Sequence, residues 1–421
     1  MPPIDELSPE ELTQFARLVL PVRVKEKHCM GEVFTPPPLI HQMLDTMPNS
    51  VWKNPNAKWL DPSCGVGNFF IFVYLRLMNG LSQWQPNKIK RQQHIVKNML
   101  YMAELNRENY DICRRLFGKY ANIWCGDFLS NSMPYRDTVF HYVVGNPPFQ
   151  KDLSDKGRGI KLYNQIFLKA FGLLQHNGLL LFVVPDNMFS GMSNPGYKEL
   201  VSHWVKFVSF NGVENYFTGI KQEMCYFLAQ KTETETETET KRTKIENQNG
   251  DVIYTILTQR HLNPVRNWTP QTERLVNKYV LCRRNNAKYN RGQALSNYIG
   301  EKYPLIYTFN KNLHTNDLKM AVGFGVPKIV IFTISPNFEF KVDWDGTYGV
   351  GPNTIYIPFL KKKHGKSLET FFNSSDYKLL AQSTRTTRQY IKLALIEYLN
   401  IPLIIGNTNN TNKTKKRKNN E

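Results

Sequence analysis

The chain has 421 residues, of which 41% are hydrophobic and 13% aromatic, values that exclude a disordered or fibrous protein and fit two folded domains. Lysine and arginine number 54 against 35 aspartates and glutamates, and the net charge of +19 favours a polyanionic partner, above all nucleic acid. The six cysteines lack the spacing of a disulfide framework or a zinc site, so we expect no metal. Because no signal peptide or long apolar run is present, we expect a soluble intracellular protein of the cytoplasm or nucleus.

The predicted elements begin with a helix over residues 5–20, where Ser8 and Glu11 have the spacing of a capping box. From residue 57 onwards, short apolar runs alternate with helical segments, which predicts a parallel, doubly wound α/β sheet. Its strands are predicted at residues 57–60, 99–103, 122–125, 139–144, 179–184, 206–210 and 224–229, and the helices between the earlier strands at 68–78, 107–117 and 163–174. Since such sheets bind ligands at the carboxyl ends of their strands, polar residues that follow the strands are the candidates for a site.

A Thr-Glu repeat over residues 232–240 has no apolar face to bury and predicts a solvated linker. Beyond it, residues 328–334 and 354–359 have the composition of strands and predict a second, α+β domain. The predicted division is therefore a domain over residues 1–231, a linker over 232–244, a second domain over 245–405 and a disordered basic tail over 406–421.

Three acidic residues lie at or after the ends of successive predicted strands. The first belongs to the turn Asp61-Pro62-Ser63-Cys64-Gly65-Val66-Gly67, whose glycines allow a ligand to approach the backbone, although a purely structural turn is the alternative. Glu104 follows the next strand, after a segment over 80–94 that we interpret as an inserted loop and helix, and a carboxylate there can accept both ribose hydroxyls of an adenosine-containing cofactor. Asp127 follows the third strand and can accept a hydrogen bond from an adenine amino group.

The run Val143-Val144-Gly145-Asn146-Pro147-Pro148-Phe149 ends the fourth predicted strand and is the most specific feature of the sequence. Adenine N6 is a poor nucleophile because its lone pair is delocalised into the ring. The amide oxygen of Asn146 and the backbone carbonyl of Pro147 can accept its two hydrogens, while the prolines hold that carbonyl in place. Phe149 offers a flat face on which an extruded base can stack. The run predicts methyl transfer to adenine N6, and a Pro-Pro turn leaving a strand is the structural alternative.

In this order, the segments resemble the motifs of the gamma-class N6-adenine DNA methyltransferases of restriction-modification systems. Residues 31–36 with Phe34, Thr35 and Pro36 resemble motif X, which contacts the methionine part of the cofactor. Motif I is matched by Asp61, Pro62, Cys64, Gly65 and Gly67, motif II by Glu104, and motif III by Asp127. The catalytic motif IV is matched by Asn146, Pro147, Pro148 and Phe149. The resemblance also implies that Asn146 lies beside the cofactor.

The resemblance spans residues 31–230 and implies a Rossmann-like, seven-stranded methyltransferase domain followed by an α+β target-recognition domain. It implies S-adenosyl-L-methionine as the cofactor, double-stranded DNA as the partner, base flipping, and direct transfer of the methyl group without a covalent intermediate or a metal. It leaves open whether a cognate restriction endonuclease exists. Because only about thirty residues precede motif X, a fused nuclease domain is not expected.

Further residues are candidate contacts to the target base and to DNA. Residues 163–174 and 178–189 resemble the helix and strand that wall the target-base pocket, which implies a contact between Phe189 and the flipped adenine. In the second domain Arg283, Arg284 and Lys328 are candidate DNA contacts, and an ordinary solvated basic face is the equal alternative for each basic cluster.

Three other functions compete with this interpretation. An RNA adenine methyltransferase would use identical chemistry, and a protein glutamine methyltransferase also uses an Asn-Pro-Pro motif, though in a smaller and less basic chain. A non-catalytic DNA-binding specificity module is the third alternative, and the presence of both the cofactor and the catalytic motifs argues against it. The recognition sequence and the oligomeric state do not follow from the sequence.

Overall fold

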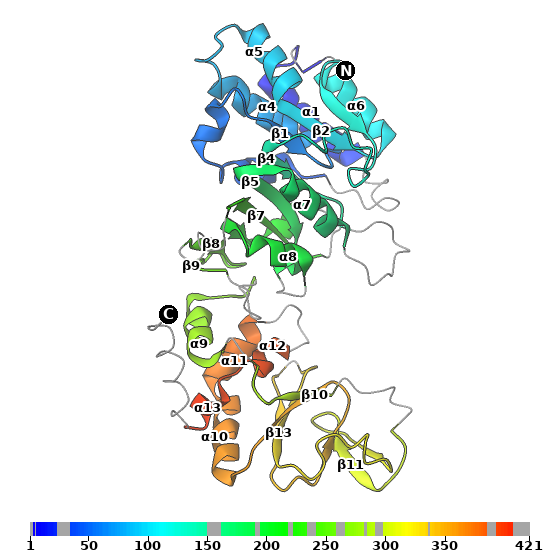
Figure 1. Cartoon of the computed structure of the whole chain (residues 1–421), viewed down its shortest axis with the longest axis vertical. Coiled ribbons are helices and arrows are strands. Elements are labelled where there is room, and N and C mark those ends of the chain that lie inside the picture. Colours follow the sequence, from blue (N-terminus) through cyan, green and yellow to red (C-terminus); the bar gives the residue numbers. More distant parts are fainter. Residues whose placement is uncertain are drawn as a thin grey trace. The chain divides into compact units, whose positions relative to one another are not determined.

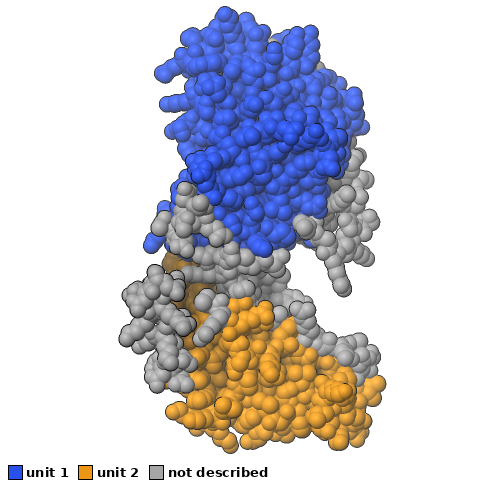
Figure 2. Space-filling view, in the orientation of Figure 1, with its two compact units in different colours: residues 1–259 blue, residues 260–421 orange. Residues whose placement is uncertain are grey.

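The computed structural model describes residues 3–4, 6–22, 34–149, 161–189, 194–217, 222–233, 241–257, 266–281, 284–290, 298–335, 337–384 and 393–406, without the side chains of 17–22 and 393–394. The chain forms two compact units, unit 1 over residues 1–259 and unit 2 over residues 260–421 (Figure 2). None of the helices in the described ranges combines the length and the apolar character needed to cross a bilayer.

Unit 1 is organised around a nine-stranded sheet with the strand order β3-β2-β1-β4-β5-β7-β6-β8-β9 (Figure 1). The strands are β1 (Trp59–Asp61), β2 (Leu100–Glu104), β3 (Asn122–Cys125), β4 (Phe140–Gly145), β5 (Leu174–Pro185), β6 (Trp204–Ser209), β7 (Met224–Gln230), β8 (Thr243–Glu246) and β9 (Val252–Thr255). The first five strands pair in parallel, whereas β7 runs antiparallel to both β5 and β6. Each of the seven strands predicted from the sequence is present, and the predicted doubly wound α/β sheet is confirmed.

Helices cover both faces of this sheet, as the side chains of β5 show. Leu181 and Val183 belong to the apolar cluster that contains residues of α1, α3, α4 and α6, whereas Leu180 and Phe182 belong to the cluster that contains residues of α7 and α8. Successive side chains of a strand point to opposite faces, so the apolar run of β5 is explained by burial on both sides. The helices are α1 (Pro9–Val22), α3 (Pro37–Leu44), α4 (Asn68–Gly80), α5 (Lys88–His94), α6 (Arg107–Phe117), α7 (Leu162–Gly172) and α8 (Pro195–Leu200).

Two local predictions about unit 1 are confirmed. At the start of α1 the Ser8 amide donates to Oε2 of Glu11 at 2.7 Å, and the Glu11 amide donates to Oγ of Ser8 at 3.1 Å, which is a capping box. The segment between α4 and β2 contains the short helix α5, followed by the π-helical turn η2 (Ile95–Met99) that leads into β2. The insertion before Glu104 is therefore a folded part of unit 1.

The predicted domain boundary at residues 232–244 is wrong. Strand β8 pairs in parallel with β6, and β9 pairs antiparallel with β8, so the sheet of unit 1 continues to Thr255. The Thr243 hydroxyl donates to the Val205 carbonyl at 2.6 Å, and Ile245 is buried in the apolar cluster of α7 and α8. The composition of the Thr-Glu repeat does not indicate where the following strands pair. Residues 234–240 of the repeat lie outside the described residues.

Unit 2 has mixed α and β structure, as predicted. Its four-stranded sheet has the order β10-β16-β13-β14, and its three-stranded sheet has the order β12-β11-β15. The elements are α9 (Pro270–Tyr279), β10 (Lys288–Asn290), β11 (Tyr303–Ile306), β12 (Asn312–Thr315), β13 (Lys328–Phe332), β14 (Phe340–Asp343), β15 (Gly349–Val350), β16 (Thr354–Pro358), α10 (Lys362–Asn373), α11 (Ser375–Ser383), α12 (Leu393–Glu397) and α13 (Ile401–Ile404). Residues 407–421 of the predicted basic tail lie outside the described residues.

Candidate active site

A cavity of about 560 Å³ lies at the carboxyl ends of β1, β2, β3 and β4 in unit 1. Its walls include Phe34 with Thr35, the turn 61–65, the start of α4, Glu104, Asp127, the run 146–149 and two residues of α7, Leu162 and Ile166. Four adjacent parallel strands end at the same edge of the sheet, and this explains why residues so far apart in the sequence share one cavity.

The turn between β1 and α4 requires both of its glycines, for different reasons. Gly65 has φ +56° and Gly67 has φ +88°, a backbone conformation that other residues rarely adopt. A Cβ atom at Gly67 would lie 2.7 Å from Cε2 of Phe117, so this glycine permits close packing on α6 and does not line the cavity. A Cβ atom at Gly65 would lie 2.9 Å from Cε1 of Phe34, whose ring therefore lies directly over the turn.

Glu104 connects the turn to the end of β2. Its Oε2 atom accepts the Gly65 amide at 2.7 Å, and its Oε1 atom accepts the Asn106 amide at 2.8 Å. The Cys64 amide donates to the carbonyl of Ala103 at 3.0 Å, which adds a second link between the same two segments. These contacts fix the position of the carboxylate against the cavity.

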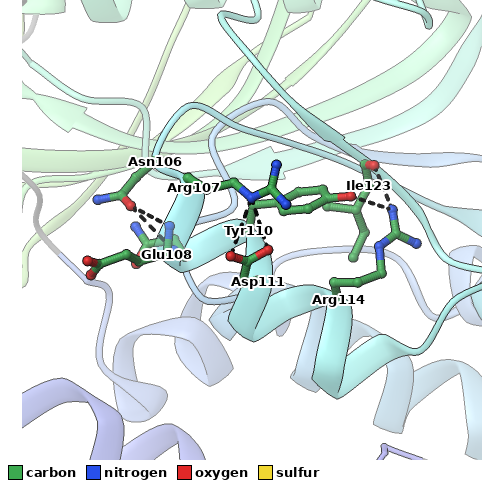
Figure 3. Close-up of polar contacts among 8 residues, drawn as sticks. Asn106, Arg107, Glu108, Tyr110, Asp111, Arg114 and Ile123 are labelled. Atoms are coloured by element: carbon green, nitrogen blue, oxygen red, sulfur yellow. Dashed lines mark hydrogen bonds and ion pairs between the residues drawn. The ribbon is translucent and has the colours of Figure 1, made fainter.

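The start of α6 is capped by the side chain of Asn106 (Figure 3). The Asn106 side chain caps the helix by accepting the amides of Glu108 and Asn109, at 2.9 and 3.4 Å. At the other end of the helix, Arg114 donates to the carbonyl of Ile123 at 2.9 Å and so ties α6 to β3 (Figure 3). Asn106 is a cavity residue that the sequence interpretation missed, and its helix-capping position after β2 was the available signal.

Asp61 is the last residue of β1, the strand that pairs with β4, and is only 1% exposed. Its Oδ1 atom accepts the Ser63 amide at 3.1 Å. Burial raises the pKa of Asp61 to about 8, the Ser63 hydrogen bond lowers it, and the nearby Glu104 raises it further. A Cβ atom at Gly145 would lie 2.9 Å from Oδ1 of Asp61, so a glycine is needed for β4 to pass beside the carboxyl group.

The run 146–149 begins immediately after β4 and forms another wall of the cavity. The Ser63 hydroxyl donates to the backbone carbonyl of Asn146 at 3.5 Å, a long contact between the turn after β1 and this run. Phe149 is half-buried and packs against both apolar clusters of unit 1. All four residues of the predicted catalytic motif therefore line the same cavity as Asp61 and Glu104.

The remaining residues that were predicted to bind the cofactor are Asp127 and those around Phe34. Asp127 is exposed at the end of β3, and its Oδ1 atom accepts the amide of Leu129 at 2.9 Å. Thr35 lines the cavity, whereas Pro36 is the N-cap residue of α3 and is not among the lining residues. Pro62 and Cys64 line the cavity within the turn, and residues 31–33 of the predicted motif X lie outside the described residues.

The predicted contact between Phe189 and a target base is contradicted by the structure. The Phe189 side chain is 1% exposed, does not line the cavity, and has its ring 5.6 Å from that of Phe227 and 5.9 Å from that of Phe210. The short helix η3 (Asp186–Phe189), which follows β5, places this side chain in the apolar cluster of α7 and α8. Sequence resemblance locates the residue after the strand and does not determine the direction of its side chain.

The predicted DNA contact of Lys328 is also contradicted. Its side chain is 0% exposed, and Nζ donates to Oδ2 of Asp343 and to the carbonyls of Val326 and Tyr348. The lysine therefore links β13 to β14 and to the segment before β15 within unit 2. Arg284 is mostly exposed and lies 3.6 Å from Glu397, so its DNA contact stays a prediction, and Arg283 lies outside the described residues.

Comparison with known proteins identifies relatives of unit 1. Residues 21–168 match the family model of N-6 DNA methylases. Over 87 residues, 20% of this chain, the sequence is 38% identical to an uncharacterized adenine-specific methylase of Mycoplasma pneumoniae. The match covers 21% of that relative's length.

Solved structures with a similar fold cover most of the chain. The Type IIL restriction-modification enzyme MmeI in complex with DNA has a TM-score of 0.52 at 13% identity, over 91% of this chain and 70% of that one. The ATP-dependent Type ISP restriction-modification enzyme LlaBIII bound to DNA has a TM-score of 0.55 at 9% identity, over 92% of this chain and 40% of that one. The predicted fold class, a Rossmann-like α/β sheet followed by an additional C-terminal domain, is confirmed, but the sheet has nine strands where seven were predicted.

Proposed function

We propose that this protein uses S-adenosylmethionine to methylate N6 of adenine in double-stranded DNA. The match of residues 21–168 to the N-6 DNA methylase family supports this proposal. The observation that carries the proposal is the cavity in which Glu104, Asp127 and Asn146 lie together at the carboxyl ends of adjacent strands. An adenosine-containing cofactor and an exocyclic amine have the hydrogen-bonding groups that these three side chains complement.

The residues of the cavity fit S-adenosylmethionine. A carboxylate has about four acceptor positions, so Glu104 can serve two ribose hydroxyls as well as the amides of Gly65 and Asn106. Asp127 is exposed at the end of the next strand, where its carboxylate can accept the adenine amino group of the cofactor. When bound, S-adenosylmethionine supplies an electrophilic methyl group.

Asn146 and Pro147 are proposed to hold the target amine. The Asn146 amide oxygen and the Pro147 carbonyl accept the two N6 hydrogens, which favours the tetrahedral, positively charged nitrogen that develops during transfer. Because Pro147 and Pro148 restrict the backbone, the acceptors require little rearrangement at the moment of reaction. The chain would supply orientation and hydrogen bonding. N6 would form a bond to the methyl carbon as the methyl–sulfur bond breaks, which leaves S-adenosylhomocysteine, and the methylated nitrogen would then lose one proton to solvent.

The target adenine must leave the duplex to reach this cavity. Phe149 is proposed to stack on the extruded base, and its half-buried position between the two apolar clusters supports a fixed ring orientation. Unit 2 is proposed as the target-recognition domain, with Arg284 among its DNA contacts. The net charge of +19 supports a DNA partner, as do the DNA complexes of MmeI and LlaBIII, whose fold this chain shares.

The proposal is tested by incubating the purified chain with tritiated S-adenosylmethionine and unmethylated genomic DNA, followed by digestion and chromatography of the nucleosides. We expect labelled N6-methyldeoxyadenosine, and label in the asparagine-to-alanine variant N146A that is lower by about 100-fold. Label that resists deoxyribonuclease and disappears with ribonuclease would assign the RNA activity instead. Label in protein would assign a protein methyltransferase, and failure to bind S-adenosylmethionine would favour a non-catalytic DNA-binding module.

A further inference from the structure

Lysines gather at the edge of the unit 1 sheet that is opposite the cavity. Lys58 directly precedes β1, Lys97 lies three positions before β2, and Lys119 lies three positions before β3. Since these three strands pair in parallel, their amino ends share one edge, just as their carboxyl ends share the cavity. Helix α4 has 13 residues and runs back from the cavity wall towards this edge, a length of about 20 Å.

The segment between α4 and β2 adds cations to this edge without adding acids. Residues 62–103 contain no aspartate or glutamate, although they contain five lysines and arginines. The name basic edge is used for six lysines, namely Lys53, Lys58, Lys88, Lys90, Lys97 and Lys119. Lys58 is partly buried and the other five are exposed. Within the described residues, none of the six forms an ion pair, so no described carboxylate neutralises their charge.

Two hydrogen bonds join the parts of the chain that carry these lysines. Nε2 of His94, the last residue of α5, donates to the Pro55 carbonyl at 2.7 Å, which joins α5 to the segment after η1 (Asn49–Lys53). Nδ2 of Asn122 donates to the carbonyl of Lys97 at 2.8 Å, which joins η2 to the start of β3. The basic edge is therefore one connected part of unit 1.

The helical segment 88–99 directs Lys90 and Lys97 to solvent. Gln92, Ile95 and Met99 are buried and form its inner side. Lys90 and Lys97 are exposed and lie seven positions apart, which is about two helical turns, so both lie on the outer side. Two cations at this spacing can contact successive phosphates of a polyanion.

We propose that the basic edge binds the phosphates of a second DNA segment, distinct from the one whose adenine enters the cavity. The inference rests on the proposed function for its choice of DNA as the partner. Duplex DNA carries one negative charge per about 1.7 Å of its axis, which a row of unneutralised lysines complements. Because the persistence length of DNA is about 50 nm, a short duplex bound at the cavity does not bend round the sheet to the opposite edge.

The test counts the DNA duplexes that one full-length chain binds. Short duplexes of random sequence are titrated at low salt into the wild type and into the double variant Lys90→Ala/Lys97→Ala, and sedimentation velocity gives the number bound per chain. We expect the wild type to bind a second duplex, and the variant to bind it more weakly by about 10-fold. The slope of log affinity against log salt for this second step should become shallower by about 2, since each lost phosphate contact contributes about 0.9.

The double variant Lys198→Ala/Lys244→Ala is the matched control. It removes two exposed lysines of α8 and β8 and changes the net charge of unit 1 by the same amount. Its second binding step should match that of the wild type. Melting temperatures close to the wild-type value in both variants would confirm that the fold is intact, as expected when exposed side chains are shortened.

The outcomes are distinguishable. A single duplex per wild-type chain, or an unchanged second step in Lys90→Ala/Lys97→Ala, would overturn the inference. Equal weakening in both double variants would overturn it as well, because the effect would then follow net charge alone. Stronger binding of an RNA duplex than of DNA at the second step would assign RNA to the basic edge instead. If the second step behaves as expected but no DNA is methylated, the proposed function fails while the basic edge remains a DNA-binding surface.

Discussion

The backbone amide of Gly65 donates a 2.7 Å hydrogen bond to the carboxylate of Glu104, which joins the turn after β1 to the end of β2. The same carboxylate accepts the amide of Asn106 at the start of α6. One side chain therefore fixes three segments of the cavity wall, and its removal should affect the cofactor site and the fold together.

Glu104→Gln should weaken binding of S-adenosylhomocysteine by about tenfold or more and lower the melting temperature. The replacement amide has one acceptor oxygen, so its NH₂ group must face one of the two backbone amides that the carboxylate accepts. Titration calorimetry and a thermal scan measure the two effects. Affinity and melting temperature equal to those of the wild type would show that neither hydrogen bond matters.

Asn146→Ala should reduce kcat for DNA methylation by about 100-fold or more, the loss seen when a single preorganised polar group is removed from a transition state. Its affinity for S-adenosylhomocysteine should stay within about threefold, because Glu104 and Asp127 are unchanged. Single-turnover kinetics with saturating DNA measure the first quantity and calorimetry the second. Near-normal kcat would contradict the assignment of the run 146–149.

Gly67→Ala should lower the free energy of unfolding more than Gly250→Ala does. Both glycines have positive φ, +88° and +84°, so both replacements introduce backbone strain of about 1–3 kcal/mol. A Cβ atom at Gly67 would also lie 2.7 Å from the Phe117 ring, whereas one at Gly250 would lie at an ordinary contact distance, 3.5 Å, from Nδ2 of Asn211. Chemical denaturation followed by fluorescence compares the two variants, and equal losses would argue against the steric contribution.

Much of the site could be predicted because its residues follow strands and the strands have strong local patterns. The turn after β1 and the run after β4 were predicted to bind the cofactor and the target amine, and the structure places both in one cavity with Glu104 and Asp127. The roles of these residues stay predictions. The carboxyl ends of parallel strands meet at one edge of a sheet, so the prediction of a parallel sheet was sufficient to place these segments together.

The direction of individual side chains could not be predicted in the same way. Phe189 and Lys328 occupy segments that the sequence analysis identified as functional, yet packing around them places one in an apolar cluster and the other beside Asp343. The hydrogen bond from Nδ2 of Asn68 to the Thr35 carbonyl was missed because the two residues lie 33 positions apart in the sequence. Similarly, the pairing of β8 with β6 depends on tertiary contacts that the Thr-Glu repeat does not encode.

Asp61 should make stability depend on pH. Its pKa is raised by burial from 3.8 to about 8, so the folded state binds the proton more tightly than the unfolded state does. The stabilisation is fully present below pH 4 and is lost as pH rises towards 8. The free energy of unfolding of the wild type should therefore fall relative to that of Asp61→Asn across this range. Denaturant titrations at a series of pH values measure the difference, and parallel pH profiles would refute the prediction.

Lys328→Ala should lower the free energy of unfolding of unit 2 by about 3–5 kcal/mol, because it leaves the Asp343 carboxylate buried without its cation. Burial lowers the pKa of Lys328 and the contact with Asp343 raises it, so the charge of the lysine depends on that partner. Lys378→Ala, which removes an exposed lysine of α11, is the matched control and should change stability by less than about 0.5 kcal/mol. Hydrogen exchange of the amides of β13 and β14 localises the effect to unit 2. A variant that lost DNA affinity while keeping normal protection in these strands would instead restore the interpretation of Lys328 as a direct contact to DNA.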